Sequence, residues 1–169
     1  MSTEITEKLL DAALSHVPFD GWSETTMRAA IVDTGIDPTV ARALFPRGAV
    51  DLALAYHRRG DALMEQAMAQ ADLGTMRYRD RVAFAVRKRL EAVEDREVVR
   101  RGTTLFSLPL YAADGARAIW GTADRIWTAL GDTSDDTRHD DLRGRIPGAL
   151  PARAEARRRG GVVLPDSRF

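Results

Sequence analysis

Apolar residues recur every three or four positions through nearly all of residues 3–130, and no segment alternates apolar and polar residues as a strand does. The first stripe, for example, contains Ile5, Leu9, Ala13 and Val17 at four-residue spacing. This spacing places apolar side chains on one face of a helix. The chain, 169 residues long, is therefore predicted to fold as an all-α domain with a buried core.

Capping and helix-breaking residues divide this pattern into separate helices. Ser23 is suited to the first cap of a helix, Gly35 to a left-handed stop, and Asp37 to a cap directly before a proline. Pro18 and Gly21 are expected to close the first helix after residue 16. The expected helices cover residues 3–16, 24–34, 39–44, 49–71, 76–93, 96–108 and 112–130.

Two short helices joined by a tight turn across residues 23–45 indicate a helix-turn-helix unit, a geometry that many proteins place in the DNA major groove. DNA binding also needs Lys and Arg to neutralise phosphates. Residues 20–51 contain three Arg against five acidic residues, a net charge of −2. The expected reading helix also offers few side chains that contact bases. The unit is therefore interpreted as architecture, and DNA binding is not expected.

The charge is distributed unevenly along the chain. Lys plus Arg and Asp plus Glu both total 25, but residues 138–169 hold eight Arg against four acidic residues. The same segment is rich in Pro and Gly and shows no helical or strand period. We expect a poorly ordered tail, either simply solvated or serving as a basic arm for anionic partners.

Cysteine is absent, which excludes disulfides, thiol nucleophiles and thiolate metal sites. The sequence has neither a signal-peptide pattern nor an apolar run that could span a membrane, so a cytoplasmic protein is expected. His57 and Asp61 lie four residues apart, which suits a metal pair, but a surface hydrogen bond is the simpler interpretation. No metal, cofactor or catalytic residue is predicted.

Large apolar side chains gather in the later helices, and they have two interpretations. They either fill an ordinary core or enclose a cavity for a lipid-sized ligand, for which flexible Met side chains are suited. Spacing alone does not choose between these. The residues are Met64, Met68, Phe84, Leu105, Phe106, Trp120 and Trp127.

Four sequence strings carry a resemblance to a known family. They are LLDAAL at residues 9–14, FDGWSETT at 19–26, ALFPRGAVDL at 43–52 and IWGTADRIWTALGDTSDD at 119–136. Together they resemble the ubiquinone (coenzyme Q) biosynthesis accessory proteins of TetR-like fold, the ninth of the Coq series. The resemblance implies a TetR-like helical bundle over residues 1–137, with a helix-turn-helix subunit at 1–47 and ligand-binding helices at 48–137.

The resemblance also implies a function. It suggests a non-catalytic protein, possessing no cofactor, that binds an isoprenoid quinone intermediate or a phospholipid and presents quinone intermediates to a membrane-bound hydroxylase. The expected lipid-binding residues are Met64, Met68, Val82, Val86, Leu90, Leu105, Trp120 and Trp127. The expected partner-binding residues are Ile126, Trp127, Asp132 and Asp136.

The resemblance stops at Thr137. The family continues there with a further long helix and later an amphipathic helix that lies on the membrane, and residues 138–169 match neither. This departure suggests a truncated or frameshifted end, with weak peripheral contact at the inner membrane through the basic tail. The alternatives are a TetR-type DNA-binding transcription regulator and a nonfunctional truncated copy, and the sequence leaves open whether a homodimer forms.

Overall fold

A computed structural model describes residues 2–131, and every regular element in that range is helical. This confirms the predicted all-α class for the described residues, while the TetR-like topology stays a prediction. The tail at 138–169 lies outside this range. The elements are α1 (Ser2–Asp20), α2 (Glu24–Thr34), α3 (Pro38–Leu44), α4 (Ala49–Gln70), a single 3-10 turn at Leu73–Thr75, α5 (Tyr78–Glu91), α6 (Arg96–Phe106) and α7 (Ala112–Ala129).

The predicted caps of the helix-turn-helix unit are present. The Ser23 side chain accepts a hydrogen bond from the backbone N–H of Thr26, and Gly35 closes α2 with a φ of 65°. The Asp37 carboxylate accepts from the Thr39 N–H at 2.7 Å and caps α3. Because local capping chemistry determines these boundaries, they could be predicted from the sequence.

The first helix ends four residues later than expected, closed at Gly21 rather than before Pro18. Helix α1 continues through Pro18 to Asp20. A proline in the last turn removes one backbone donor without breaking the turns before it. Gly21, at a φ of 66°, closes the helix by donating its N–H to the Val17 carbonyl at 2.9 Å. The other helix ends lie within two residues of their expected positions.

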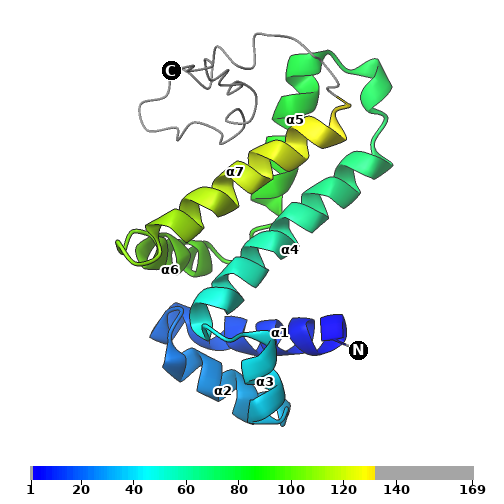
Figure 1. Cartoon of the computed structure of the whole chain (residues 1–169). Coiled ribbons are helices and arrows are strands. Elements are labelled where there is room, and N and C mark those ends of the chain that lie inside the picture. The colour runs from blue at the N-terminus through cyan, green and yellow to red at the C-terminus, as the bar shows by residue number, and fades with distance from the viewer. Residues whose placement is uncertain (1, 132–169) are drawn as a thin grey trace, which may run out of the picture. The chain divides into compact units, whose positions relative to one another are not determined.

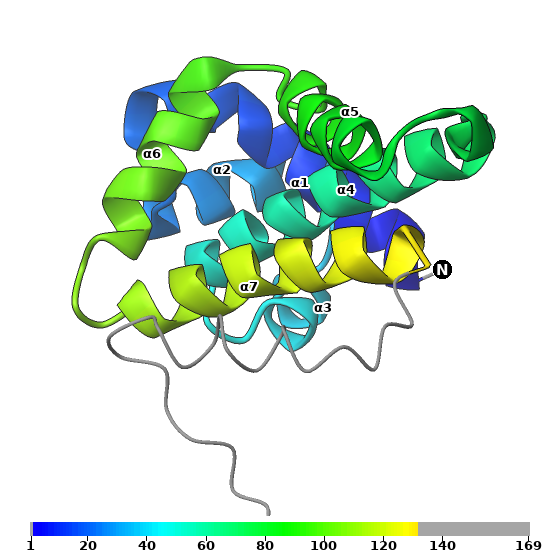
Figure 2. The same cartoon turned by 90° about the horizontal axis from the view of Figure 1, so that it is seen from above.

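The described helices form two connected groups. Figure 1 shows α1, α2 and α3 gathered at the first turns of α4. Helix α4 then runs between α5 and α7, and it packs against both, as the view from above shows (Figure 2). Helix α6 contacts α1 and α7, so it connects the N-terminal helices to the later ones.

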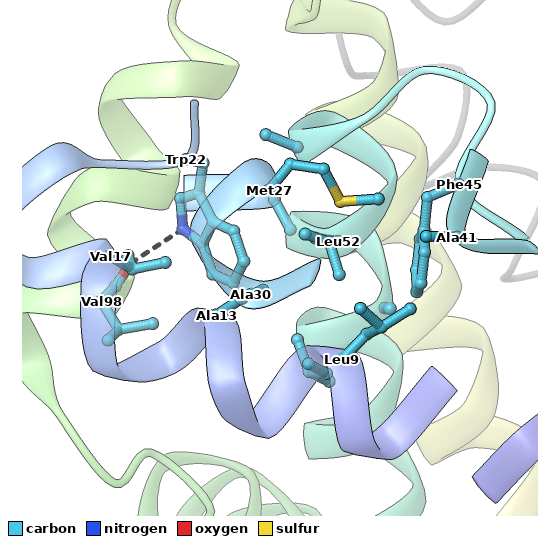
Figure 3. Packing of buried hydrophobic residues seen from close by; sticks show 14 residues of the cluster. Leu9, Ala13, Val17, Trp22, Met27, Ala30, Ala41, Phe45, Leu52 and Val98 are labelled. Carbon is cyan, nitrogen blue, oxygen red and sulfur yellow. Dashed lines mark hydrogen bonds between the residues drawn. The ribbon is translucent and has the colours of Figure 1, made fainter. Parts of the chain in front are cut away.

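The main hydrophobic core joins the N-terminal helices to α4 and α6. Leu9, Met27 and Leu52 are fully buried in it, and they meet from α1, α2 and α4 (Figure 3). Trp22, in the turn before α2, donates its indole N–H to the Val98 carbonyl of α6 at 3.2 Å. The N-terminal unit is therefore continuous with the later helices through one shared core.

Candidate functional site

Helices α4, α5, α6 and α7 enclose a pocket of about 530 Å³, and Trp22 contributes to its wall. The volume is in the range of small-molecule sites, about 300–1,000 Å³, and the lining is mainly apolar, as such sites usually are. The lining residues are Trp22, Ala53, Tyr56, His57, Arg89, Leu90, Val93, Val98, Val99, Gly102, Thr103, Phe106, Gly115, Ala118, Ile119, Thr122, Ala123 and Ile126.

Two features of the sequence shape the α6 and α7 side of this pocket. A Cβ at Gly115 would lie 2.7 Å from Phe106 Cβ, so only glycine allows α7 to approach α6 this closely. The Trp22 indole is held by its hydrogen bond to Val98 and lies 5.8 Å, between ring centroids, from the Tyr56 ring. A rigid aromatic pair thus forms part of the pocket wall.

One corner of the pocket is polar and rests on a buried ion pair. Asp61 on α4 is only 2% exposed, and its Oδ1 accepts from Arg89 Nε on α5 at 2.7 Å. The Thr122 hydroxyl on α7 donates to the same oxygen at 2.9 Å. These contacts join three helices. We call Asp61, Arg89, His57 and Thr122 the polar corner.

His57 completes the polar corner as a neutral imidazole. Its Nε2 lies 3.1 Å from the Ala118 carbonyl, which can only accept, and its Nδ1 lies 3.3 Å from Arg89 Nη2, which can only donate. The proton is therefore on Nε2. Burial lowers the pKa of His57 below its usual value, and the nearby Asp61 carboxylate only partly opposes this shift.

The sequence interpretation of His57 and Asp61 as a surface hydrogen bond is wrong. Asp61 is buried, and its Oδ2 lies 3.6 Å from His57 Nε2, beyond a hydrogen bond. Their main partners come from α5 and α7, which four-residue spacing does not reveal. A local signal does exist in Gly60, because a Cβ there would lie 2.5 Å from Arg89 Nη1.

The expected lipid-binding residues lie in several places. Leu90 lines the pocket. Met64 and Met68 are buried in a second apolar cluster with Ala85 and Leu130, against which Val82 packs. The remaining expected residues are Leu105, packed against the main core, and the exposed side chains Val86, Trp120 and Trp127. The structure therefore does not gather the eight residues into one site, and lipid contact stays a prediction.

The expected partner-binding residues are described only in part. Ile126 lines the pocket, and it also packs against the second apolar cluster. Trp127 is 39% exposed and stacks with Tyr78 at 6.0 Å between ring centroids. Asp132 and Asp136 lie outside the described residues.

Most arginines in and next to the helix-turn-helix unit form ion pairs with carboxylates of the same chain. Arg42 pairs with Glu24, and Arg47 pairs with Asp51 at 2.9 Å and with Asp114 of α7 at 3.2 Å. Two of the three arginines in residues 20–51 are therefore bound to carboxylates of the same chain. This leaves little positive charge for a phosphate backbone.

The chain is similar to a curated protein, the "Ubiquinone biosynthesis protein COQ9, mitochondrial" of Drosophila melanogaster. The two are 31% identical over 137 residues, which is 78% of this chain. The chain spans 42% of that protein's length. No protein-family model matches. Among the described helices, none has the length and apolar character needed to cross a bilayer.

Proposed function

From the distant homology of this chain to COQ9, which confirms the predicted resemblance, we propose that it is a non-catalytic lipid-binding protein of ubiquinone biosynthesis. It holds the isoprenoid chain of a quinone intermediate in the pocket between α4, α5, α6 and α7. The observation that carries this proposal is the mainly apolar pocket of about 530 Å³.

The lining supplies enough apolar surface to retain a prenyl segment. Burial of each CH2-sized group contributes about 0.8 kcal/mol, so two isoprenoid units contribute roughly 8 kcal/mol before the cost of ordering the chain. Leu90 and Ile119, each 67% exposed, lie at the open side of the pocket. A longer tail leaves the pocket over these side chains.

The polar corner supports a non-catalytic role. Asp61 accepts from both Arg89 and Thr122, and both His57 nitrogens have partners. A general base needs a free lone pair within reach of a substrate proton. The neutral His57 has no such free lone pair, because its Nδ1 accepts from Arg89, and Asp61 Oδ1 is occupied by two donors.

Presentation to a hydroxylase belongs to the same proposal. Ile126 lines the pocket, and the next residue, Trp127, is partly exposed. A hydroxylase bound at the end of α7, over Ile126, Trp127, Asp132 and Asp136, would therefore meet a ligand at the adjacent pocket. Contact with the membrane surface gives access to the lipid.

The proposal is tested by native mass spectrometry of the full chain purified gently from cells, together with two variants. Ala123 lines the pocket, so Ala123→Trp fills it, whereas Ala116 is exposed on the same helix and does not line it. We expect a bound isoprenoid or phospholipid in the wild type and in Ala116→Trp, and at least a severalfold lower occupancy in Ala123→Trp.

Other outcomes contradict the proposal. Co-purified nucleic acid without lipid would favour a TetR-type regulator. An empty, aggregating wild type would favour a nonfunctional copy. Equal lipid occupancy in Ala123→Trp and Ala116→Trp would show that the ligand lies elsewhere.

A further inference from the structure

The pocket is amphipathic, and its polar groups lie together. Arg89, His57 and Thr122 all line it. Arg89 and Thr122 both bond Asp61, and His57 contacts Arg89 and Thr122 directly. A purely hydrocarbon ligand would leave this corner without a ligand partner. The polar corner can therefore contact the polar head of a ligand, while the apolar lining contacts its tail.

The polar corner carries no net charge. Arg89 is paired with Asp61 at 2.7 Å, and His57 is neutral. Arg125 approaches Asp61 to 3.9 Å, but its closer partner is Glu65 at 2.9 Å. No positive charge in this network is left over to balance a phosphate, whose transfer from water to a neutral, partly buried corner is costly.

Some hydrogen-bond donors at the polar corner nevertheless have no acceptor among the described residues. Arg89, which lines the pocket, uses Nε for Asp61 and Nη2 for His57, while Nη1 packs beside Gly60 and makes no hydrogen bond to the described residues. The Tyr56 hydroxyl is buried beside the backbone of Glu94 and donates no hydrogen bond to a described residue. A guanidinium N–H bonded to a neutral oxygen is a charge-assisted hydrogen bond, which is stronger than a neutral one.

We propose that the polar corner selects the neutral oxygen of an isoprenoid head, such as a hydroxyl or a quinone carbonyl, over both a phosphate head and a bare hydrocarbon. Arg89 is the donor to this oxygen. Asp61 sets the preference by cancelling the charge of Arg89. This inference rests on the proposed function, because it names the class of head that the same pocket accepts.

The test uses three probes that share one fifteen-carbon tail: farnesene, farnesol and farnesyl phosphate. Equilibrium dialysis of the full chain with each probe gives three dissociation constants. We expect farnesol to bind about tenfold more tightly than either of the others, the gain of roughly one good hydrogen bond. Farnesyl phosphate binding as tightly as farnesol, or farnesene doing so, would overturn the inference.

The same measurement separates this inference from the proposed function. If all three probes bind equally well, the pocket carries lipid but does not select its head. If none binds, the carrier proposal fails, and head selection fails with it.

Asp61→Asn tests the role of the carboxylate. Asparagine keeps an oxygen acceptor for Arg89 and Thr122 but removes the negative charge, so the corner becomes cationic. We expect farnesyl phosphate to bind at least tenfold more tightly than in the wild type, with farnesene unchanged. An unchanged affinity for farnesyl phosphate would contradict this role of Asp61. If the variant does not fold, the order in which the wild type binds the three probes decides.

Glu91→Gln is the matched control. Glu91 lies on α5 two residues beyond Arg89, is exposed, and bonds Lys88 Nζ at 2.7 Å away from the pocket lining. The variant makes the same change in net charge. We expect it to bind the three probes in the same order as the wild type. If its affinity for farnesyl phosphate rises as much as that of Asp61→Asn, the net charge of the protein explains the effect, and the position of Asp61 does not.

Discussion

Replacement of Arg89 by methionine is expected to lower the free energy of unfolding by about 3–5 kcal/mol, the usual cost of leaving one member of a buried ion pair uncompensated. The Asp61 side chain is only 3% exposed, so water does not replace the lost guanidinium. Arg87→Met is the control, because Arg87 is exposed on the same helix. Urea unfolding of both variants measures the difference, and equal costs would contradict the importance of the pair.

A double variant separates the charge from the packing. In Arg89→Met combined with Asp61→Asn, neither partner is charged, and most of the lost stability is expected to return. Asp61→Asn alone is expected to cost less than Arg89→Met. The Arg89 side chain is 19% exposed and keeps its bonds to His57, so it tolerates the loss of its partner better. If the double variant loses as much unfolding free energy as the two single variants together, Asp61 and Arg89 are not coupled.

Leu52→Ala is expected to destabilise the protein by about 2–5 kcal/mol, the range for a buried leucine that leaves a cavity. Leu52 on α4 is fully buried where the N-terminal helices meet the later ones (Figure 3). The matched control is Leu63→Ala, because Leu63 is on the same helix but is 43% exposed. Its expected cost is within about 0.5–1 kcal/mol. Similar unfolding midpoints in urea for the two variants would contradict the shared core.

The helix boundaries could be predicted because their causes are local. Ser23, Gly35 and Asp37 act on backbone groups within a few residues of themselves, so the sequence alone reveals them. Pro18 was misjudged because a proline in the last helical turn is compatible with the helix, whereas Gly21, which was also expected to close the helix, does so.

The pocket could not be predicted in the same way. Helical periodicity identifies which residues share a face, but not which neighbouring helix covers that face. Met64 and Met68 share their apolar stripe with core residues and are buried against Ala85 rather than in the pocket. The polar corner depends on Arg89 reaching Asp61 across 28 residues of sequence, a contact that spacing along one helix does not contain.

We expect the ligand in the pocket between α4, α5, α6 and α7 with its head at the polar corner, and photolabelling tests this placement most directly. A farnesol analogue with a diazirine at the end of its tail is bound to the full chain and irradiated, and the labelled residues are mapped by tandem mass spectrometry. We expect labels on pocket residues such as Val99, Thr103, Ile119 and Ala123, and their loss in Ala123→Trp. Labels concentrated on Met64 and Met68, or on the exposed face of Trp120, would contradict it.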